Sequence, residues 1–525
     1  MKQKFLFALL LLLGTTNLSA QRSEINIEQI RKLQYAQLAI ANLYVDSIDQ
    51  QKLAEDAING MLSKLDPHSA YTNAEQTKKM NEPLEGNFEG IGVQFNMLDD
   101  TLVVIQPTSK GPSEKAGIVA GDRIVLVDGA PIAGVKMERD SIMRLLRGPK
   151  GSKVRLGIVR RGVKDIIYFN ITRDKIPVAT LDAAYIIAPT IGYIHLDRFG
   201  ATSGEEVHNA IKKLQEEGME SLILDLGVNG GGYLGAAVDV ASEFLPAGSL
   251  VVYTKGRAAP QQELKAKTGG LFLKGRLAIL VDEYTASAAE IVSGAVQDHD
   301  RGVIIGRRTF GKGLVQRPIE LPDGSMIRLT VSHYYTPSGR CIQKPYVKGE
   351  KEKYNEDLNT RYTHGELMHL DSIHLDSTKV YRTLVENRPV YGGGGIMPDI
   401  FVPLDTTSYT PYYRAISRNN LLTNAAIKFS DNNRKQLKKC YRDFSTFRTS
   451  YTIPTSLLDE IEAEAAKKNL KPATDAERAE TRKDLAFMLK ALVAYNVWDR
   501  SEYYEIINER SDIVKRAVQE LSAGK

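Results

Sequence analysis

Apolar positions at both ends of the chain recur with the spacing of a helix. In residues 24–80 apolar side chains return every three or four positions, and glycine is nearly absent. Residues 410–525 are rich in charge, and segments 459–469 and 476–494 are the clearest helix candidates there. The pattern therefore predicts helical regions at the two ends of the chain, with a different organisation between them.

Residues 84–174 follow another pattern, in which short apolar runs alternate with turns that contain glycine. Such runs are typical of strands joined by tight turns. Two stretches, near 112–117 and 137–146, have helical spacing instead. We expect a small β-rich domain with two helices. The predicted strands are residues 91–95, 102–106, 123–127, 154–160 and 166–171.

Residues 175–345 alternate apolar strands with amphipathic helices. Strands that alternate with helices pair in parallel through crossover connections. This part is therefore expected to be an α/β domain. The predicted strands are residues 191–196, 221–226, 276–281, 303–306 and 327–333, and the predicted helices are residues 203–217, 236–244 and 286–296.

The composition is that of an ordinary globular protein. The 525 residues are 42% apolar and 25% charged, which excludes a disordered, collagen-like or multi-spanning membrane protein. The net charge of +5 is spread along the chain, whereas nucleic-acid binding usually needs a concentrated basic face, so we expect no nucleic-acid partner. The two cysteines, Cys341 and Cys440, form one disulfide or remain two reduced thiols, and they lack zinc-ligand spacing.

The first twenty residues have the pattern of a secretory signal peptide. Lys2 and Lys4 precede an unbroken apolar run at residues 5–13, and a more polar stretch ends at Ala20. The run is too short to span a bilayer as a helix. We expect residues 1–20 to be cleaved and the protein to be exported to the periplasm; membrane association through an uncleaved signal is the alternative.

A first candidate site is the turn at residues 89–93 (EGIGV), which precedes a predicted strand. Two glycines around one apolar residue let successive backbone N–H groups point at a carboxylate. Together with residues 111–117 (GPSEKAG), 121–125 (GDRIV) and 127–129 (VDG), this turn resembles a PDZ domain of the bacterial protease type. The resemblance implies that Gly90, Ile91, Gly92 and Val93 receive the C-terminal carboxylate of a peptide.

A second candidate is Ser287, at the junction between an apolar strand and an apolar helix. The N–H groups of a first helical turn lack internal partners and favour negative charge. This position suits a nucleophile whose attack creates an oxyanion, although a simple helix-capping serine is the alternative.

Lys312 lies in residues 309–316 (TFGKGLVQ), between two glycines. An exposed loop lysine is the plain interpretation. If the fold buries the side chain, desolvation lowers its pKa, and a neutral lysine can act as a general base. A phosphate-binding loop is excluded, because the upstream glycine spacing is wrong and glycine follows the lysine.

The combination of residues 285–292 (TASAAEIV), 309–313 (TFGKG) and 315–316 (VQ) resembles the carboxyl-terminal processing, or tail-specific, serine peptidases. The resemblance covers about residues 30–402. It implies that Ser287 is the nucleophile, Lys312 the general base and Gln316 the residue that orients the lysine. Such a dyad needs no metal or other cofactor.

Residues 225–232 (DLGVNGGG) follow a predicted strand and contain three consecutive glycines. The resemblance implies that a backbone N–H here, of Gly231 or else Gly230, joins that of Ala288 in an oxyanion hole. The family usually has arginine where this chain has Gly227, which leaves open how the loop is held.

Histidine-based sites are disfavoured. His364, His369 and His374 are spaced by five, not by the four that metalloprotease helices use. His299 lies beyond the helix that begins at Ser287, so a Ser–His–Asp triad explains fewer residues than the dyad does.

The resemblance implies a mixed α/β fold, with a peptidase core of the ClpP/crotonase-like type, an inserted PDZ domain and helical regions at both ends. We expect a signal peptide at 1–20, a helical segment at 21–82, the PDZ domain at 83–174, the core at 175–405 and a helical region at 406–525. The expected function is an exported serine endopeptidase acting on proteins or peptides with apolar C-termini, and the helical regions are candidate surfaces for a homo-oligomer. The alternative is a peptide-binding PDZ adaptor with an inactive core.

Overall fold

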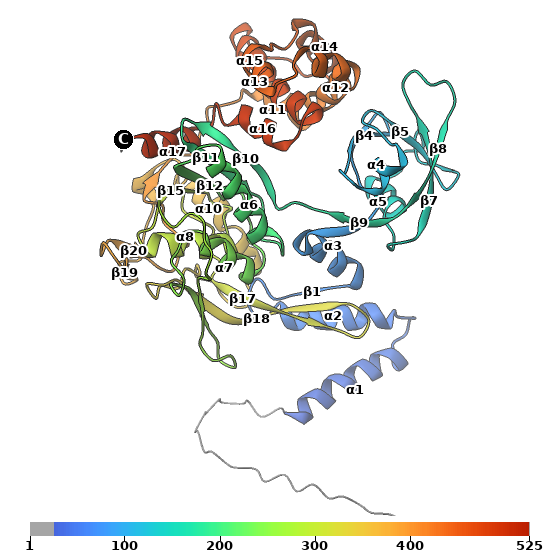
Figure 1. Cartoon of the computed structure of the whole chain (residues 1–525). Coiled ribbons are helices and arrows are strands. Elements are labelled where there is room, and N and C mark those ends of the chain that lie inside the picture. The colour runs from blue at the N-terminus through green and yellow to red at the C-terminus, as the bar shows by residue number, and fades with distance from the viewer. Residues whose placement is uncertain (1–25, 524–525) are drawn as a thin grey trace, which may run out of the picture.

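A computed structural model describes residues 26–523, which form helices and sheets in several bodies (Figure 1). The signal-peptide prediction concerns residues outside that range. No helix within residues 26–523 combines the length and the hydropathy that crossing a membrane requires. Cys341 and Cys440 are both free thiols, which settles the choice that the sequence left open.

The N-terminal helices begin at polar capping residues. Asn26 caps α1 (Ile27–Leu43), Asp49 caps α2 (Gln50–Leu62) and Asn73 caps α3 (Ala74–Glu85), each accepting hydrogen bonds from N–H groups of the first turn. No side chain of α1 is buried, and this helix extends away from the rest of the molecule (Figure 1). The short strand β1 (Ala70–Thr72) lies between α2 and α3.

Residues 87–177 form the predicted small β-rich domain, here called the PDZ-like domain. Its entry and exit strands, β2 (Asn87–Gly90) and β9 (Asp174–Pro177), pair with each other. Between them lies an antiparallel sheet in the order β3-β4-β5-β7-β8, in which β6 pairs with β5. The elements are β3 (Val93–Leu98), β4 (Thr101–Pro107), α4 (Pro112–Ala116), β5 (Arg123–Val127), β6 (Ala130–Pro131), α5 (Arg139–Leu146), β7 (Lys153–Val159) and β8 (Ile167–Thr172).

The core contains a six-stranded sheet in the order β10-β11-β12-β15-β16-β21, parallel except for the antiparallel β10–β11 pair. Alternate residues of its buried strands face opposite sides. Ile194, Leu224 and Ile279 pack with α6, α7 and α8 on one side, while residues on the other side pack with α17. The elements are β10 (Leu181–Ala188), β11 (Ile191–Leu196), α6 (Ser203–Glu216), β12 (Ser221–Asp225), α7 (Leu234–Ser242), β15 (Arg276–Val281), α8 (Ala288–Asp298), β16 (Val303–Gly306), β21 (Ile400–Phe401) and α17 (Asp512–Ser522).

A second, five-stranded sheet joins the N-terminal segment to the core, because β1 pairs with β18. Its other strands come from the core segment, and the smaller elements near residues 351–391 follow it. These elements are β13 (Leu250–Lys255), β14 (Gln262–Lys265), β17 (Leu314–Glu320), β18 (Met326–Tyr335), α9 (Lys351–Asn355), α10 (Asp357–Thr363), η1 (Leu370–Ser372), β19 (Val380–Arg382) and β20 (Pro389–Tyr391).

The C-terminal helices form a body with its own apolar core, which includes Ile416, Ile461 and Leu485. This body touches both neighbours: α16 packs against β10 of the core, and α12 contacts β3 of the PDZ-like domain. It lies above the core and the PDZ-like domain in Figure 1. Its helices are α11 (Pro411–Arg418), α12 (Leu421–Cys440), α13 (Phe444–Ser450), α14 (Thr455–Lys467), α15 (Asp475–Val497) and α16 (Arg500–Ile507).

Candidate active site

Ser287 lies at a strained corner between β15 and α8. Its backbone angles are φ 56° and ψ −114°, a conformation that side-chain-bearing residues rarely adopt. Strain of this kind costs on the order of 1–3 kcal/mol and persists only where surrounding contacts hold it. The following residue, Ala288, is the first of α8, so its N–H has no partner within the helix.

Lys312 comes from the loop between β16 and β17. Burial, aided by the positive charge of Arg328, lowers the pKa of its ammonium group, while the carboxylates of Glu290 and Asp66 oppose that shift. Nζ of Lys312 donates a hydrogen bond of 3.2 Å to Oε1 of Gln316. The lysine is therefore not a solvated surface charge, which was the plain interpretation of the sequence.

Gln316 is itself held by a segment that sequence reasoning gave no role. Its Nε2 donates to the backbone carbonyl of His68 at 2.6 Å. Asp66 shapes this turn by accepting hydrogen bonds from the N–H groups of His68 and Ser69. Burial, with the nearby charge of Lys312, lowers the pKa of His68 to about 4, so its imidazole is neutral at physiological pH.

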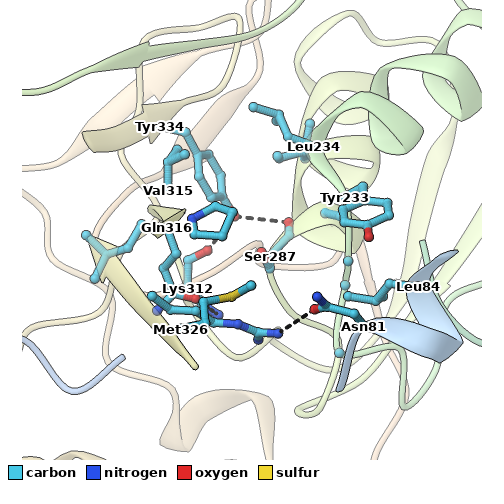
Figure 2. Close-up of a pocket in the computed structure, with 18 of the residues that line it drawn as sticks. Asn81, Leu84, Tyr233, Leu234, Ser287, Lys312, Val315, Gln316, Met326 and Tyr334 are labelled. Atoms are coloured by element: carbon cyan, nitrogen blue, oxygen red, sulfur yellow. Dashed lines mark hydrogen bonds between the residues drawn. The ribbon is translucent and has the colours of Figure 1, made fainter. Parts of the chain in front are cut away.

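One cavity of about 570 Å³ joins these groups (Figure 2). Ser287, Ala288, Lys312 and Gln316 line it together with the predicted glycines Gly230 and Gly231. Among the described residues there is no hydrogen bond between Oγ of Ser287 and Nζ of Lys312. The rest of the lining is Asn81, Leu84, Glu85, Gly232, Tyr233, Leu234, Ile291, Leu314, Val315, Pro318, Glu320, Met326, Arg328 and Tyr334.

The glycine-rich loop is held by side-chain acceptors, although it has Gly227 where the resemblance implies arginine. Asp225 accepts from the N–H of Gly227 at 2.8 Å, and Asp282 accepts from that of Val228. Asn229 is fully buried, and its Oδ1 accepts the N–H of Gly231 at 2.8 Å. Side chains therefore hold the loop in place, but the N–H of Gly231 already donates its hydrogen bond to Asn229 within the loop.

Gly231 lies directly against the serine corner. Its φ is +94°, and a Cβ on it would lie 2.8 Å from Cβ of Ser287 and 2.9 Å from the nitrogen of Ala288. Within the described residues, the N–H groups of Ala288 and Gly230 donate no hydrogen bond. The glycine-rich loop therefore comes this close to the Ser287 corner because residue 231 has no side chain.

A second cavity of about 390 Å³, here called the tail pocket, lies beside the PDZ-like domain. Ile91, Gly92 and Val93 line it, whereas Gly90 is paired in the β2–β9 ladder and does not. Its apolar lining includes Phe88, Phe95, Met143 and Leu146, and its cationic lining residues are Lys79, Arg139, Arg147, Arg198 and Arg500.

The histidine alternatives do not converge on Ser287. His299 follows the last residue of α8, about 18 Å along the helix from the serine, and its Nε2 bonds with the carbonyl of Leu250. Within residues 26–523, no group of three or more His, Cys, Asp or Glu side chains is arranged to hold a metal ion.

Family models match four parts of the chain. The model "Peptidase family S41" matches residues 190–351, and "PDZ domain" matches residues 90–168. "Activating protease CtpB N-terminal domain" matches residues 13–76, and a family of unknown function matches residues 412–499.

Individual relatives agree with these matches. A carboxy-terminal-processing protease of Bartonella bacilliformis is 40% identical over 305 residues, covering 57% of this chain and 69% of the relative. The carboxy-terminal processing protease CtpA of Bacillus subtilis is 34% identical over 351 residues, covering 66% of this chain and 74% of the relative. Among solved structures, a photosystem II D1 C-terminal processing protease matches at 26% identity and a TM-score of 0.36, over 72% of this chain and 93% of that chain.

The two curated relatives each exceed 30% identity over more than two thirds of their own length, and the S41 and PDZ matches fall on the core and on the PDZ-like domain. The chain belongs to the carboxy-terminal processing proteases of peptidase family S41, with a PDZ domain and helical segments at both ends.

Proposed function

We propose that this protein is an exported serine endopeptidase that binds the C-terminal tails of proteins and hydrolyses peptide bonds with a Ser287–Lys312 dyad. The observation that carries the proposal is the shared cavity, which holds a hydroxyl on a strained corner and a lysine whose pKa is lowered by burial. Gln316 orients the lysine through its 3.2 Å hydrogen bond.

The chemistry follows from these positions. Neutral Lys312 takes the proton of Oγ of Ser287 as the oxygen attacks the substrate carbonyl. The N–H of Ala288 and one from Gly231 or Gly230 stabilise the oxyanion, and for Gly231 this requires release from Asn229. The lysine then protonates the leaving amine and becomes neutral again. It next takes a proton from a water molecule, which hydrolyses the acyl-enzyme.

The tail pocket supplies recognition. β3 is an edge strand of its sheet, so an extended tail can pair with it while the carboxylate meets the N–H groups near Gly92. Helix α3 separates the two cavities: Lys79, Glu82 and Pro83 line the tail pocket, and Asn81, Leu84 and Glu85 line the active-site pocket. A tail that shifts the PDZ-like domain therefore acts on α3, and we propose that this movement brings Lys312 to within about 3 Å of Ser287.

The expected partners are proteins or peptides with apolar C-termini. The apolar residues of α1, from Ile27 to Leu43, are exposed in the single chain, which supports assembly of a homo-oligomer through the helical regions. The segment at residues 1–20 supports export, with the periplasm as the proposed compartment.

The test compares wild type, Ser287→Ala and Lys312→Ala on an unfolded protein with an apolar C-terminus. We expect cleavage by wild type alone, with a loss on the order of 10⁴-fold or more in each variant, because the residues act as one unit. The wild-type rate should fall as the pH drops through the lowered pKa of Lys312, since only the neutral amine accepts a proton. The adaptor alternative is favoured instead if all three proteins bind the tail and none cleaves.

A further inference from the structure

Glu290 is fully buried, three residues after the proposed nucleophile, and its carboxylate accepts four hydrogen bonds. Oε2 accepts the N–H groups of Ser287 and Lys312, both at 2.9 Å. Oε1 accepts the N–H of Gly311 at 2.8 Å and the hydroxyl of Thr309 at 2.5 Å. One side chain thus joins the backbone of the nucleophile to the backbone of the base.

The direction of these hydrogen bonds requires an acceptor at every contact. The three backbone groups can only donate. The hydroxyl of Thr309 accepts the N–H of Ile396 at 2.6 Å, which leaves its own proton for Glu290. An ionised carboxylate offers about four acceptor sites, so this site matches a carboxylate and would oppose a donor such as an amide NH₂.

The two segments that Glu290 joins are also linked by one backbone hydrogen bond, from the N–H of Phe310 to the carbonyl of Thr285 at 3.0 Å. Ser287 holds its left-handed conformation against the strain described above, and the lysine loop is irregular between β16 and β17. The hydroxyl of Tyr334 is a second bridge, because it lies 2.5 Å from the carbonyl oxygen of Lys312 and 3.1 Å from that of Ser287. Glu290 holds the N–H groups of the same two residues.

We propose that Glu290 is the positioning residue of the active site, whose ionised carboxylate fixes the Ser287 corner and the Lys312 loop relative to each other. This inference rests on the proposed function, since it concerns the same dyad. Glu290 does not touch the substrate in this role, and it acts through the backbone of the two proposed catalytic residues.

The electrostatics give this role a second signature. Burial raises the pKa of Glu290 to about 7, against the opposing effect of its hydrogen bonds, so the carboxylate is ionised above that pH. Its negative charge raises the pKa of Lys312, whereas burial and Arg328 lower it and Asp66 raises it. His68 also faces the lysine but stays neutral. Removing the charge of Glu290 should therefore lower the pKa of Lys312 further.

The experiment measures kcat, KM and the pH profile of Glu290→Gln in the full-length protein on a tail-bearing substrate. Misplacement of reacting groups by about 1 Å costs roughly 100-fold. We expect kcat to fall by about that factor at nearly unchanged KM, and the acid limb of the profile to move to lower pH. The rate at which a fluorophosphonate labels Ser287 should fall in parallel. Glu290→Asp keeps the charge on a shorter side chain, so it should lose less activity and leave the acid limb unmoved.

Ser293→Ala is the matched control, because Ser293 is buried one turn further along α8 and bonds only to backbone carbonyls of that helix. It should keep wild-type kcat. Wild-type kcat and an unmoved acid limb in Glu290→Gln would overturn the inference. If that variant does not fold, Glu290→Asp decides: reduced kcat with normal tail binding supports the role, and wild-type kcat overturns it. Failure of the proposed function is distinct, since then either wild type would not cleave or Ser287→Ala would keep its activity.

Discussion

The active-site pocket and the tail pocket are held together in different ways. Around Ser287 and Lys312, buried groups converge from α8, the loop after β16, the glycine-rich loop and the N-terminal turn at Asp66. The PDZ-like domain is instead connected to the rest of the chain through its entry and exit strands, β2 and β9, and contacts its neighbours through partly exposed ion pairs, such as Arg147 with Glu82 and Arg123 with Asp431.

The difference in how they are held separates the pocket proposed for catalysis from the domain proposed for tail recognition. A buried polar group that loses its partner costs about 1–3 kcal/mol, so the backbone segments that carry the proposed catalytic groups are held in one arrangement. Exposed ion pairs contribute about 0–1 kcal/mol each, so a bound tail can supply enough free energy to exchange them. We infer that the core holds the backbone of the site in place and that regulation, including the approach of Lys312 to Ser287, works through the more weakly held domain.

Among the tests of this contrast, we expect the largest effect from Gly231→Ala, which disturbs the tightly held active-site pocket. The new Cβ would meet Ser287 and Ala288 at less than 3 Å, and the backbone φ of +94° disfavours alanine. Loss of one oxyanion donor alone costs about 10²–10³ in kcat, and we expect at least that decrease. The measurement is kcat on a short peptide that does not use the tail pocket.

Gly235→Ala, at the start of α7, is the control for that substitution. A Cβ there has open space, and alanine favours the helix by about 0.4–1 kcal/mol. It should keep full activity and a slightly higher Tm. Full activity of Gly231→Ala would show that the glycine-rich loop does not contribute to the reaction.

A smaller and selective effect is expected from Gly92→Ala in the tail pocket. Its φ is +73°, and an added Cβ would lie 2.8 Å from Cδ1 of Ile176. A distortion that costs about 1.4 kcal/mol weakens tail binding tenfold. We therefore expect KM for a tail-bearing protein to rise about tenfold, with no change in kcat on the short peptide.

Gly129→Ala separates strain from recognition, because its φ of +85° imposes similar backbone strain in open space away from the pocket. It should lower stability slightly and leave KM unchanged. Equal KM in wild type and Gly92→Ala would contradict docking of the tail at this turn.

The sequence predicts much of the fold because its buried strands and amphipathic helices have regular patterns. β5, β11 and β15 begin and end where the periodicity places them, and the mixed fold with an inserted PDZ domain is confirmed. Strands such as β14 and β17 were not predicted, since their side chains are largely exposed and carry little apolar alternation.

The candidate site was predictable only as far as motifs mark it. Ser287, Lys312 and Gln316 stand in short recognisable segments, and their roles remain proposals. The support from His68 and Asp66 depends on pairing between β1 and β18, more than 250 residues apart, which no local pattern reveals. Glu290 carried a signal, since glutamate three residues after a helix-capping serine is typical of a capping box, but its contacts with the lysine loop are tertiary.

The smallest expected effect concerns the ion pair between Arg123 of the PDZ-like domain and Asp431 of α12, at 2.8 Å. Because the arginine side chain is 29% exposed, we assign the pair about 1 kcal/mol, which corresponds to a population shift of roughly fivefold. Asp431→Ala should loosen the PDZ-like domain from the helical body, while the hydrogen bonds of Arg161 with Asn432 remain. We expect tail-independent cleavage to rise by up to that factor and stimulation by a tail to shrink, measured with one substrate assayed with and without a separate tail peptide.

Asp459→Ala is the control, since Asp459 pairs with Arg482 within the same helical body. Identical rates in Asp431→Ala and Asp459→Ala would mean that this ion pair does not restrain the PDZ-like domain, and the contrast between a fixed site and a regulated one would then rest on its other contacts, which include α3 and the hydrogen bonds of Arg161 with Asn432.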